Sequence, residues 1–220
     1  VLLVVYVANI RYLPLSGEGM TALLRQLVPF LNLAIAGFVL ASIAARFVFP
    51  SVSLEGRALW LLRSSPLAMR DLLWAKFWVG AVPLFVLAIV LVLFTNVLLD
   101  VSTFVQIVST TAIAALVFPL TAMALSFGAF YPQYDAENAA QIPTSFGGLL
   151  FMLSAIGLIA AVAWGTGRPA ARWVFADHFG WQFDNARLLL PFAAVATLCA
   201  LCTFLPLRLA QRKLEALERG

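Results

Sequence analysis

Long apolar runs alternate with shorter polar stretches along the whole chain. Five of these runs extend for about 20 residues, the length that a helix needs to cross the roughly 30 Å hydrocarbon core of a bilayer. They predict membrane spans at about residues 27–47, 79–99, 104–127, 146–164 and 188–207. The apolar residues 1–8 have the character of half a span, so we expect upstream protein to precede this sequence. The pattern therefore predicts an all-α, polytopic transmembrane helical bundle, with about five complete spans plus a partial N-terminal span, in a single transmembrane domain over residues 1–220.

The polar stretches predict connections of different kinds. Residues 100–103 form a very short turn, so the spans on either side of it are expected to make a helical hairpin. Residues 165–187 mix aromatic and charged side chains, as an interfacial helix or a partly re-entrant segment does. The stretch 50–78 is expected to be a loop, in which Ser65 and Pro66 start a helix over 66–78 that leads into the next span. The tail 208–220 is expected to be a short soluble helix. Pro119 predicts a kink in its span.

Small residues recur along the first complete span. Ala34, Gly37, Ala41 and Ala45 are three or four positions apart. This spacing is typical of helices that pack closely in lipid. It predicts that this face contacts another span.

The composition places the chain among membrane proteins. Hydrophobic residues make up 63% of it and charged residues 11%, whereas soluble domains are about half apolar and about a quarter charged. The formal net charge of +4 therefore does not indicate a nucleic-acid partner. The lipid bilayer is the expected surrounding, and the placement of the charges matters more than their sum.

The placement of basic residues predicts the orientation. With alternate crossings, nine basic residues fall on one side: Arg46, Arg57, Arg63, Arg70, Lys76, Arg208, Arg212, Lys213 and Arg219. Five fall on the other side: Arg11, Arg25, Arg168, Arg172 and Arg187. Because cytoplasmic loops are richer in Lys and Arg, the loop 50–78 and the C-terminal tail are expected in the cytoplasm. The predicted location is the cell (cytoplasmic or inner) membrane.

The reactive side chains do not form a recognisable catalytic motif. His178 is the one histidine, and the sequence contains no H-E-x-x-H and no G-x-S-x-G. Cys199 and Cys202 have redox spacing but lie inside an apolar run, which favours two small packed residues. No Gly-rich phosphate loop is present, so we expect no ATP site, no cofactor and no metal on this chain. The chain is not expected to be an enzyme.

The span interiors contain no Asp, Glu, Lys or His. Ion-driven carriers place such residues inside the membrane, where they are costly and functional. If the protein moves a substrate, the energy is therefore expected to enter from outside the spans. The basic loop 50–78 is the natural entry, but a second explanation stays open: the loop marks the cytoplasmic side and is held by anionic lipid.

Two loop sequences carry a family resemblance. The stretch S-L-E-G-R-A-L-W-L-L-R-S-S-P-L-A-M-R-D-L-L-W-A-K-F-W (53–78) resembles a segment of ATP-binding-cassette type-2 exporter permeases. The stretch D-A-E-N-A-A-Q-I-P-T-S-F-G-G (135–148) is similar to one in the exporter branch of that family. The resemblance is best over about residues 40–160.

The resemblance implies a membrane permease subunit that couples ATP hydrolysis by a partner to substrate export. The implied partners are a cytoplasmic ATP-binding subunit, which would hold ATP and Mg²⁺, and a second permease half in a homo- or heterodimer. The residues it implies for docking onto the ATPase are Glu55, Gly56, Arg57, Trp60, Leu61, Arg63, Ser65 and Pro66. Trp60 and Leu61 would be the apolar anchors of that interface.

Two other functions stay open from the sequence. One is a non-transporting membrane assembly or scaffold protein. The other is a lipid-modifying membrane enzyme, whose candidate polar cluster would be Asp177, His178 and Asp184.

Overall fold

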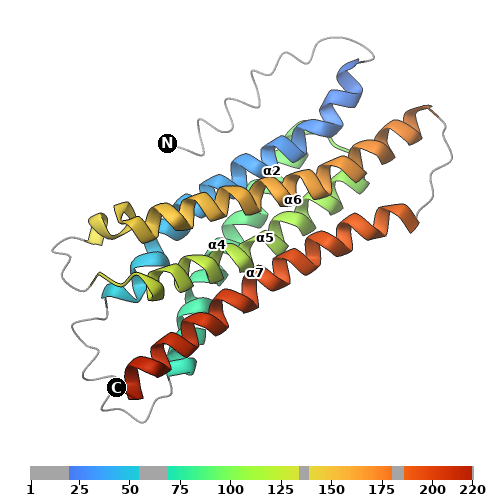
Figure 1. The fold of residues 1–220 in the computed structure, drawn as a ribbon. Helices are drawn as coiled ribbons and strands as arrows, with labels where there is room; N and C mark the ends of the chain where they lie inside the picture. The colour runs from blue at the N-terminus through green and yellow to red at the C-terminus, as the bar shows by residue number, and fades with distance from the viewer. Residues whose placement is uncertain (1–19, 55–68, 134–138, 180–185, 220) are drawn as a thin grey trace.

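The computed structural model describes residues 20–54, 69–133, 139–179 and 186–219. Five long helices cover most of these residues: α2 (Met20–Phe47), α4 (Met69–Leu99), α5 (Thr103–Phe130), α6 (Phe146–Phe179) and α7 (Ala186–Arg219). Two short 3-10 helices, η1 (Phe49–Ser51) and η3 (Ala139–Thr144), follow α2 and precede α6. The long helices run alongside one another (Figure 1).

The predicted fold class is confirmed. The described ranges contain helices and no strand. Five of the helical segments are long and apolar enough to cross a membrane: Val28–Ser51, Arg70–Leu99, Thr103–Phe130, Phe146–Val174 and Leu190–Lys213. The expected half-span 1–8 lies outside the described residues.

Helix α5 forms the centre of the bundle. It packs against α2, α4, α6 and α7, and Figure 1 shows α2 and α6 on one side of it and α7 on the other. Within its most apolar window 72% of α5 is buried, against 17% for α7. Alanine, serine, threonine and glycine are frequent in α5, and small side chains let neighbouring helices approach closely in lipid. Helix α7 therefore exposes most of its surface at the edge of the bundle.

The small residues of α2 lie at a helix interface, as their spacing predicted. Ala41 is fully buried and Ala45 is nearly so. A Cβ atom added to Gly37 would lie 3.0 Å from a methyl of Leu116 on α5 and 3.2 Å from Ile159 on α6. Gly37 thus marks a point where three helices meet.

A tight turn joins α4 to α5. Asp100 has a φ of 48°, in the left-handed region, where Asp is among the residues that tolerate it best. Next to the turn, the buried Asn96 side chain donates a 2.8 Å hydrogen bond to the hydroxyl of Ser109. This polar contact links α4 and α5 inside the apolar bundle.

Helix α6 extends further than the sequence indicated. Residues 165–179 continue the same helix to Phe179 and do not form a separate interfacial or re-entrant segment. Ala170 and Val174 lie on one face of α6 and are buried in a cluster with Phe30 and Val105. The Trp173 ring stacks on Phe104, with ring centroids 4.1 Å apart. Since these contacts bury one face of 165–174, the helix continues past its apolar core.

Helix α7 is also continuous from Ala186 to Arg219. The expected tail helix 208–220 is therefore the last part of α7 over the residues described. The predicted helix start at Ser65 and Pro66 lies outside them, and α4 is described from Met69.

Candidate lipid-facing groove between α2 and α4

The eight residues proposed for ATPase docking, Glu55 to Pro66, lie outside the described residues. So does Asp184 of the candidate polar cluster, and the side chains of Asp177 and His178 are likewise outside the described set. Among the described residues, no group of three or more His, Cys, Asp or Glu could hold a metal ion. Cys199 is buried, Cys202 is partly buried, and both are free thiols.

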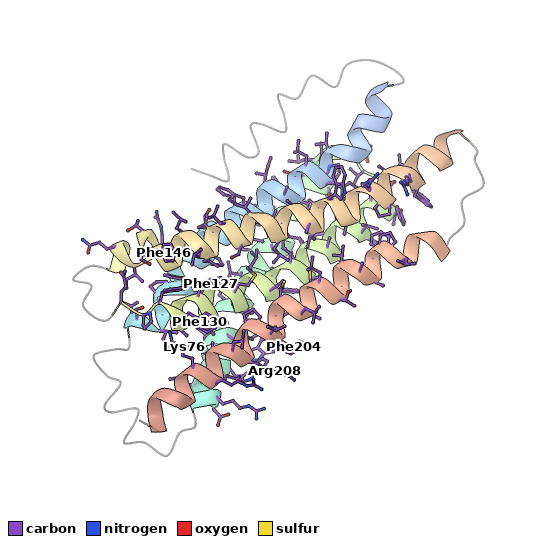
Figure 2. The ribbon with its side chains drawn as sticks, viewed as in Figure 1. Lys76, Phe127, Phe130, Phe146, Phe204 and Arg208 are labelled. Carbon is purple, nitrogen blue, oxygen red and sulfur yellow. The ribbon has the colours of Figure 1, made fainter. Side chains whose placement is uncertain are left out.

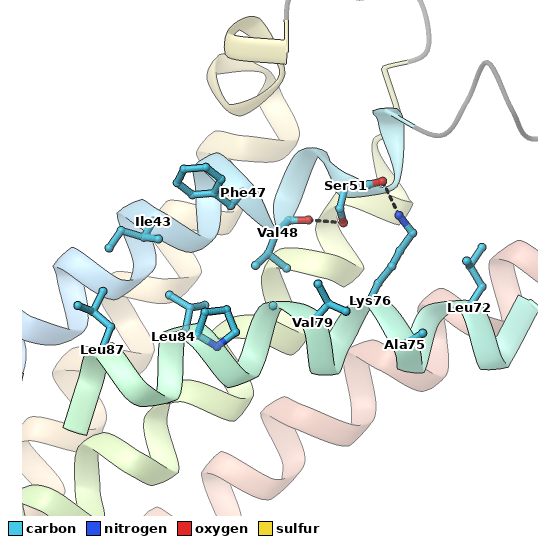
Figure 3. Close-up of a pocket in the computed structure, with 12 residues that line it drawn as sticks. Ile43, Phe47, Val48, Ser51, Leu72, Ala75, Lys76, Val79, Leu84 and Leu87 are labelled. Carbon is cyan, nitrogen blue, oxygen red and sulfur yellow. Dashed lines mark hydrogen bonds between the residues drawn. The ribbon is translucent and has the colours of Figure 1, made fainter. Parts of the chain in front are cut away.

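A groove lies where the end of α2 meets the first half of α4 (Figure 3). Its volume is about 690 Å³. The lining comes from two segments that are distant in the sequence, and the residues are Ile43, Phe47, Val48, Ser51, Leu72, Ala75, Lys76, Val79, Gly80, Pro83, Leu84 and Leu87. Among the described lining residues, all but Ser51 and Lys76 are apolar, and Leu72 lines the groove beyond Lys76 on α4. The groove is therefore an apolar surface with a polar position toward one end.

The polar position is built by a contact between η1 and α4. The Lys76 ammonium donates a 2.6 Å hydrogen bond to the backbone carbonyl oxygen of Ser51. The Ser51 hydroxyl donates in turn to the carbonyl oxygen of Val48, also at 2.6 Å. Carbonyl groups at the end of a helix have no partner within the helix and favour a nearby cation. Lys76 therefore holds η1 against α4 near one end of the groove.

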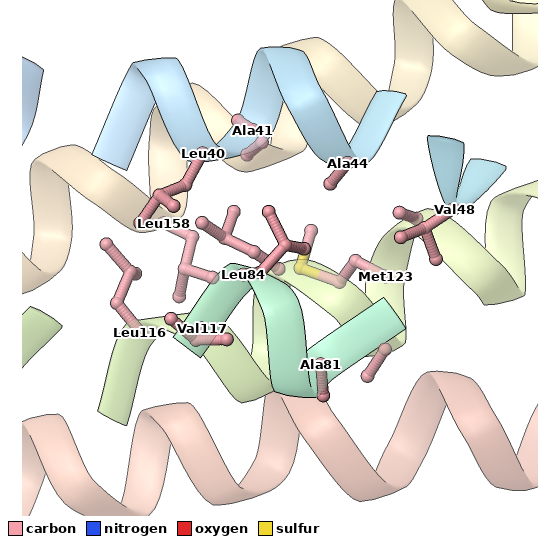
Figure 4. Close-up of a cluster of buried hydrophobic side chains, with 14 of the residues drawn as sticks. Leu40, Ala41, Ala44, Val48, Ala81, Leu84, Leu116, Val117, Met123 and Leu158 are labelled. Atoms are coloured by element: carbon pink, nitrogen blue, oxygen red, sulfur yellow. The ribbon is translucent and has the colours of Figure 1, made fainter. Parts of the chain in front are cut away.

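The floor of the groove is the core of the bundle. Val48 and Leu84 are both nearly fully buried, and they belong to a cluster formed by α2, α4, α5 and α6 (Figure 4). A Cβ atom on Gly80 would lie 2.8 Å from Val48 and 3.3 Å from Thr121. Gly80 thus lets α4 lie close to the chain just after α2, which closes the groove from below.

The open side of the groove presents apolar side chains to the surroundings. Val79 is 75% exposed and Phe47 is 69% exposed. Both lie in helices that could cross a membrane. In a membrane such exposed side chains face lipid, so lipid has direct access to the groove.

Basic residues gather at the end of the bundle that holds the polar position of the groove. Figure 2 shows Lys76 and Arg208 at this end, near Phe127 and Phe130. The charged side chains described there are Arg46 at the end of α2, Arg70, Asp71 and Lys76 at the start of α4, and Arg208, Arg212 and Lys213 in the last part of α7. Glu215, Glu218 and Arg219 follow in α7, with side chains outside the described set. At the opposite end, the described charged side chains are Asp100, Arg168 and Arg172. The two ends of the described bundle thus differ strongly in charge.

Two further contacts tie this basic end together. The Lys213 ammonium donates a 2.6 Å hydrogen bond to the carbonyl oxygen of Phe130 and lies 5.7 Å from the centre of its ring. The backbone N–H of Gln133 donates to the hydroxyl of Ser53 at 3.1 Å. Helices α5 and α7 and the segment after η1 are therefore connected at one end of the bundle.

The groove is not predictable from the sequence. In the sequence, Lys76 is one of several positive charges of a predicted loop, and no role was predicted for Ser51. The two residues are 25 positions apart, and no periodicity of the sequence connects them. Only the packing of α2 against α4 brings them together.

Comparisons with protein families, curated proteins and solved structures show to which family the chain belongs. A family model described as "Putative ATP-binding cassette" matches residues 1–219. In comparisons with curated proteins and with solved structures, nothing matched.

The family match contradicts the function that the loop motifs implied. Its description names an ATP-binding cassette and not a permease, so the assignment as a type-2 exporter permease subunit was wrong on this finding. The same match contradicts the implied partners, a separate cytoplasmic ATP-binding subunit and a second permease half, because the family that it names is itself described as an ATP-binding cassette. It gives no support to the scaffold protein or the lipid-modifying enzyme.

The prediction was wrong because it relied on short segments of the chain. The resemblance rested on two loop stretches, 53–78 and 135–148, and short loop motifs describe a local surface more than the role of a domain. The family model covers nearly the whole chain. By that match, the chain belongs to the family described as "Putative ATP-binding cassette".

Proposed function

We propose that this chain is a membrane-embedded, lipid-binding member of its family, and that the groove between α2 and α4 binds the acyl chain of a membrane lipid. The supporting observation is the groove itself, which has an apolar lining, a volume of about 690 Å³ and a polar position toward one end. Binding sites for small molecules are mostly apolar and contain a few polar groups that fix orientation. The groove has this composition.

The shape of the groove separates it from ordinary lipid-facing surface. Val82 and Val86 on α4 are also exposed, but they are not part of the groove lining. A ligand in the groove contacts α2 and α4 together, whereas lipid over Val82 contacts a convex helix surface. Concave contact buries more of an acyl chain, and the gain rises with the buried area.

We propose a binding role without chemistry at this site. Lys76 is the one ionisable residue among the described residues of the lining, and a single ammonium beside a backbone carbonyl group does not provide the acid and base pair that hydrolysis requires.

We also propose that the chain by itself holds no nucleotide, although its family description names ATP binding. ATP sites of the phosphate-loop type use G-x-x-x-x-G-K-[S/T], and the printed sequence does not contain it. Titration of the purified chain with a fluorescent ATP analogue and Mg²⁺ is expected to show no saturable binding. Saturable binding that unlabelled ATP displaces would contradict this proposal.

The orientation proposed for the chain places the basic end in the cytoplasm, within the cell membrane. The described residues there include Arg46, Lys76, Arg208 and Lys213. An excess of Lys and Arg close to the span ends favours the cytoplasmic side. The polar position of the groove then lies at the cytoplasmic leaflet.

Photo-crosslinking tests the binding function. The purified chain, in lipid nanodiscs that contain a phospholipid with a photoactivatable acyl chain, is expected to be labelled within Leu72–Leu87 and Ile43–Ser51. Val79→Trp fills the groove and should reduce labelling of both segments several-fold. Val82→Trp is the matched control, since Val82 is exposed one turn further along α4 outside the groove lining. Equal labelling in the two variants would refute the proposal.

A further inference from the structure

We infer that exposed arginines on α4 and α7 bind a phospholipid with two phosphate groups, such as diphosphatidylglycerol. The arginines are Arg70, Arg208 and Arg212, and together they are called the arginine surface below. None of them lines the groove, so this surface is separate from the groove and acts independently of it. Three features point to this ligand: the arginines lack ion pairs, their net charge is positive, and apolar side chains lie next to them.

The arginine surface combines two neighbouring helices at the basic end of the bundle. Helix α4 packs against α7, and Figures 1 and 3 both show the first turns of α4 beside the last part of α7. Arg70 lies at the start of α4, and Arg208 and Arg212 lie near the end of α7. All three are exposed. Because Arg208 and Arg212 are four positions apart, they lie on one face of α7.

The guanidinium groups of the arginine surface are not neutralised by carboxylates of the protein. In the part of the chain that the structure describes, no carboxylate forms an ion pair with Arg70, Arg208 or Arg212. Asp71 is the one acidic side chain described at this end of the bundle, so the arginine surface with Asp71 has a net charge of about +2. Arginine binds phosphate oxygens through two parallel N–H donors. Two phosphodiester groups, each with about one negative charge, match this net charge.

Apolar side chains lie directly beyond the arginines, as a lipid requires. On α7, the exposed Leu205 lies one turn before Arg208. On α4, Trp74 and Trp78 follow Arg70 at intervals of four residues and share its face of the helix. Tryptophan is enriched at the level of the lipid headgroups. A soluble phosphate compound leaves this apolar surface uncovered, whereas the acyl chains of a lipid cover it.

The tryptophan near the arginines is ordered before any ligand binds. The Trp78 ring meets Phe77 edge-to-face, with ring centroids 5.5 Å apart, and meets Phe118 of α5 at 6.4 Å. About half of Trp78 remains exposed. A side chain that is already ordered loses less entropy on binding, so this part of the surface is preorganised for an acyl chain.

Native mass spectrometry of the purified full chain measures the binding. The chain is equilibrated with diphosphatidylglycerol or with phosphatidylglycerol of identical acyl chains, at equal total phosphate. We expect the wild type to bind diphosphatidylglycerol about fivefold more tightly, because its second phosphate engages a further arginine and each basic residue contributes a factor of about five. A double variant with Arg208→Gln and Arg212→Gln should lose about 25-fold in affinity for diphosphatidylglycerol.

The matched control is a double variant with Arg46→Gln and Arg168→Gln. It also loses two exposed arginines but keeps the arginine surface, so its affinity should change by less than about twofold, since salt screens distant exposed charges. Arg208→Lys with Arg212→Lys keeps both charges and should retain most of the binding. A wild type without preference between the two lipids, or an equal loss in the two Gln pairs, would show that the arginine surface is not the binding site.

Competition identifies the kind of ligand. An equimolar amount of pyrophosphate, or of a poly-glutamate peptide, should leave the bound diphosphatidylglycerol in place, because neither covers the apolar side chains. Displacement by pyrophosphate would assign the arginines to a soluble phosphate compound, and displacement by the peptide would assign them to an acidic protein. Either result would overturn the inference.

Discussion

Single glycines decide how closely the segments of this bundle approach. Gly128 on α5 lies directly beneath the backbone of Phe49 in η1, and a Cβ atom there would overlap the carbonyl oxygen of Phe49. A backbone group cannot turn aside as a side chain can. Gly157 on α6 differs, because nothing lies within 4 Å of a Cβ atom built on it.

These two glycines therefore give a matched pair of substitutions. Gly128→Ala is expected to lower the free energy of unfolding by about 1–3 kcal/mol, the usual cost of overpacking a close contact. Gly157→Ala should leave it unchanged or raise it by up to about 1 kcal/mol, because alanine favours a helix interior over glycine. Reversible unfolding in mixed detergent micelles measures both. Similar values for the two variants would show that α5 does not press against η1.

At the scale of the element, the least buried helix, α7, is held to the bundle by a contact near its C-terminal end. Helix α7 has 17% of its apolar window buried, and near its C-terminus Lys213 reaches across to Phe130. This contact satisfies a carbonyl group in the last turn of α5, where a cation is also favoured by the helix dipole. The end of α7 thus caps α5.

Loss of this cap should loosen both helix ends. Lys213→Met removes the hydrogen bond and the contact with the ring, so amide exchange should become faster in the last turns of α5 and of α7. Arg212→Met is the control, because Arg212 is exposed and next to Lys213 in the sequence. Hydrogen exchange with mass spectrometry compares the two. Equal exchange in both variants would mean that the Lys213 contact does not hold α7.

At the scale of the whole molecule, the charges at the two ends predict the orientation in the membrane. Thr103 lies at the weakly charged end and is exposed, and Arg212 lies exposed at the basic end. Single cysteines at these positions report which end faces the outside of the cell.

Both are placed in a background that carries Cys199→Ala and Cys202→Ala. A membrane-impermeant maleimide added to intact cells should label Thr103→Cys, and it should label Arg212→Cys only after the cells are permeabilised. The opposite pattern would reverse the proposed orientation, and it would place the groove's polar position at the outer leaflet.

The sequence predicted the fold correctly but did not predict the candidate site. The predicted site was the loop motif around Glu55 and Trp60, whose residues are close together in the sequence. These residues lie outside those described. Lys76 and Ser51 form the polar position of the groove from opposite sides of that loop. The extension of α6 to Phe179 was missed for a similar reason: Trp173 is stabilised by Phe104, a residue of another helix.

The sequence by itself determined that this is a helical membrane protein with five apolar segments of spanning length, because the thickness of a bilayer sets the length of an apolar helix and backbone groups in lipid must be satisfied within the segment. These are properties of each segment alone. The tertiary structure decided that α5 is the centre, that Gly80 and Gly128 are points of close approach, and that α2 and α4 enclose a groove with Lys76 toward one end. Each of these depends on contacts between residues far apart in the chain, which the order of apolar and polar residues does not specify.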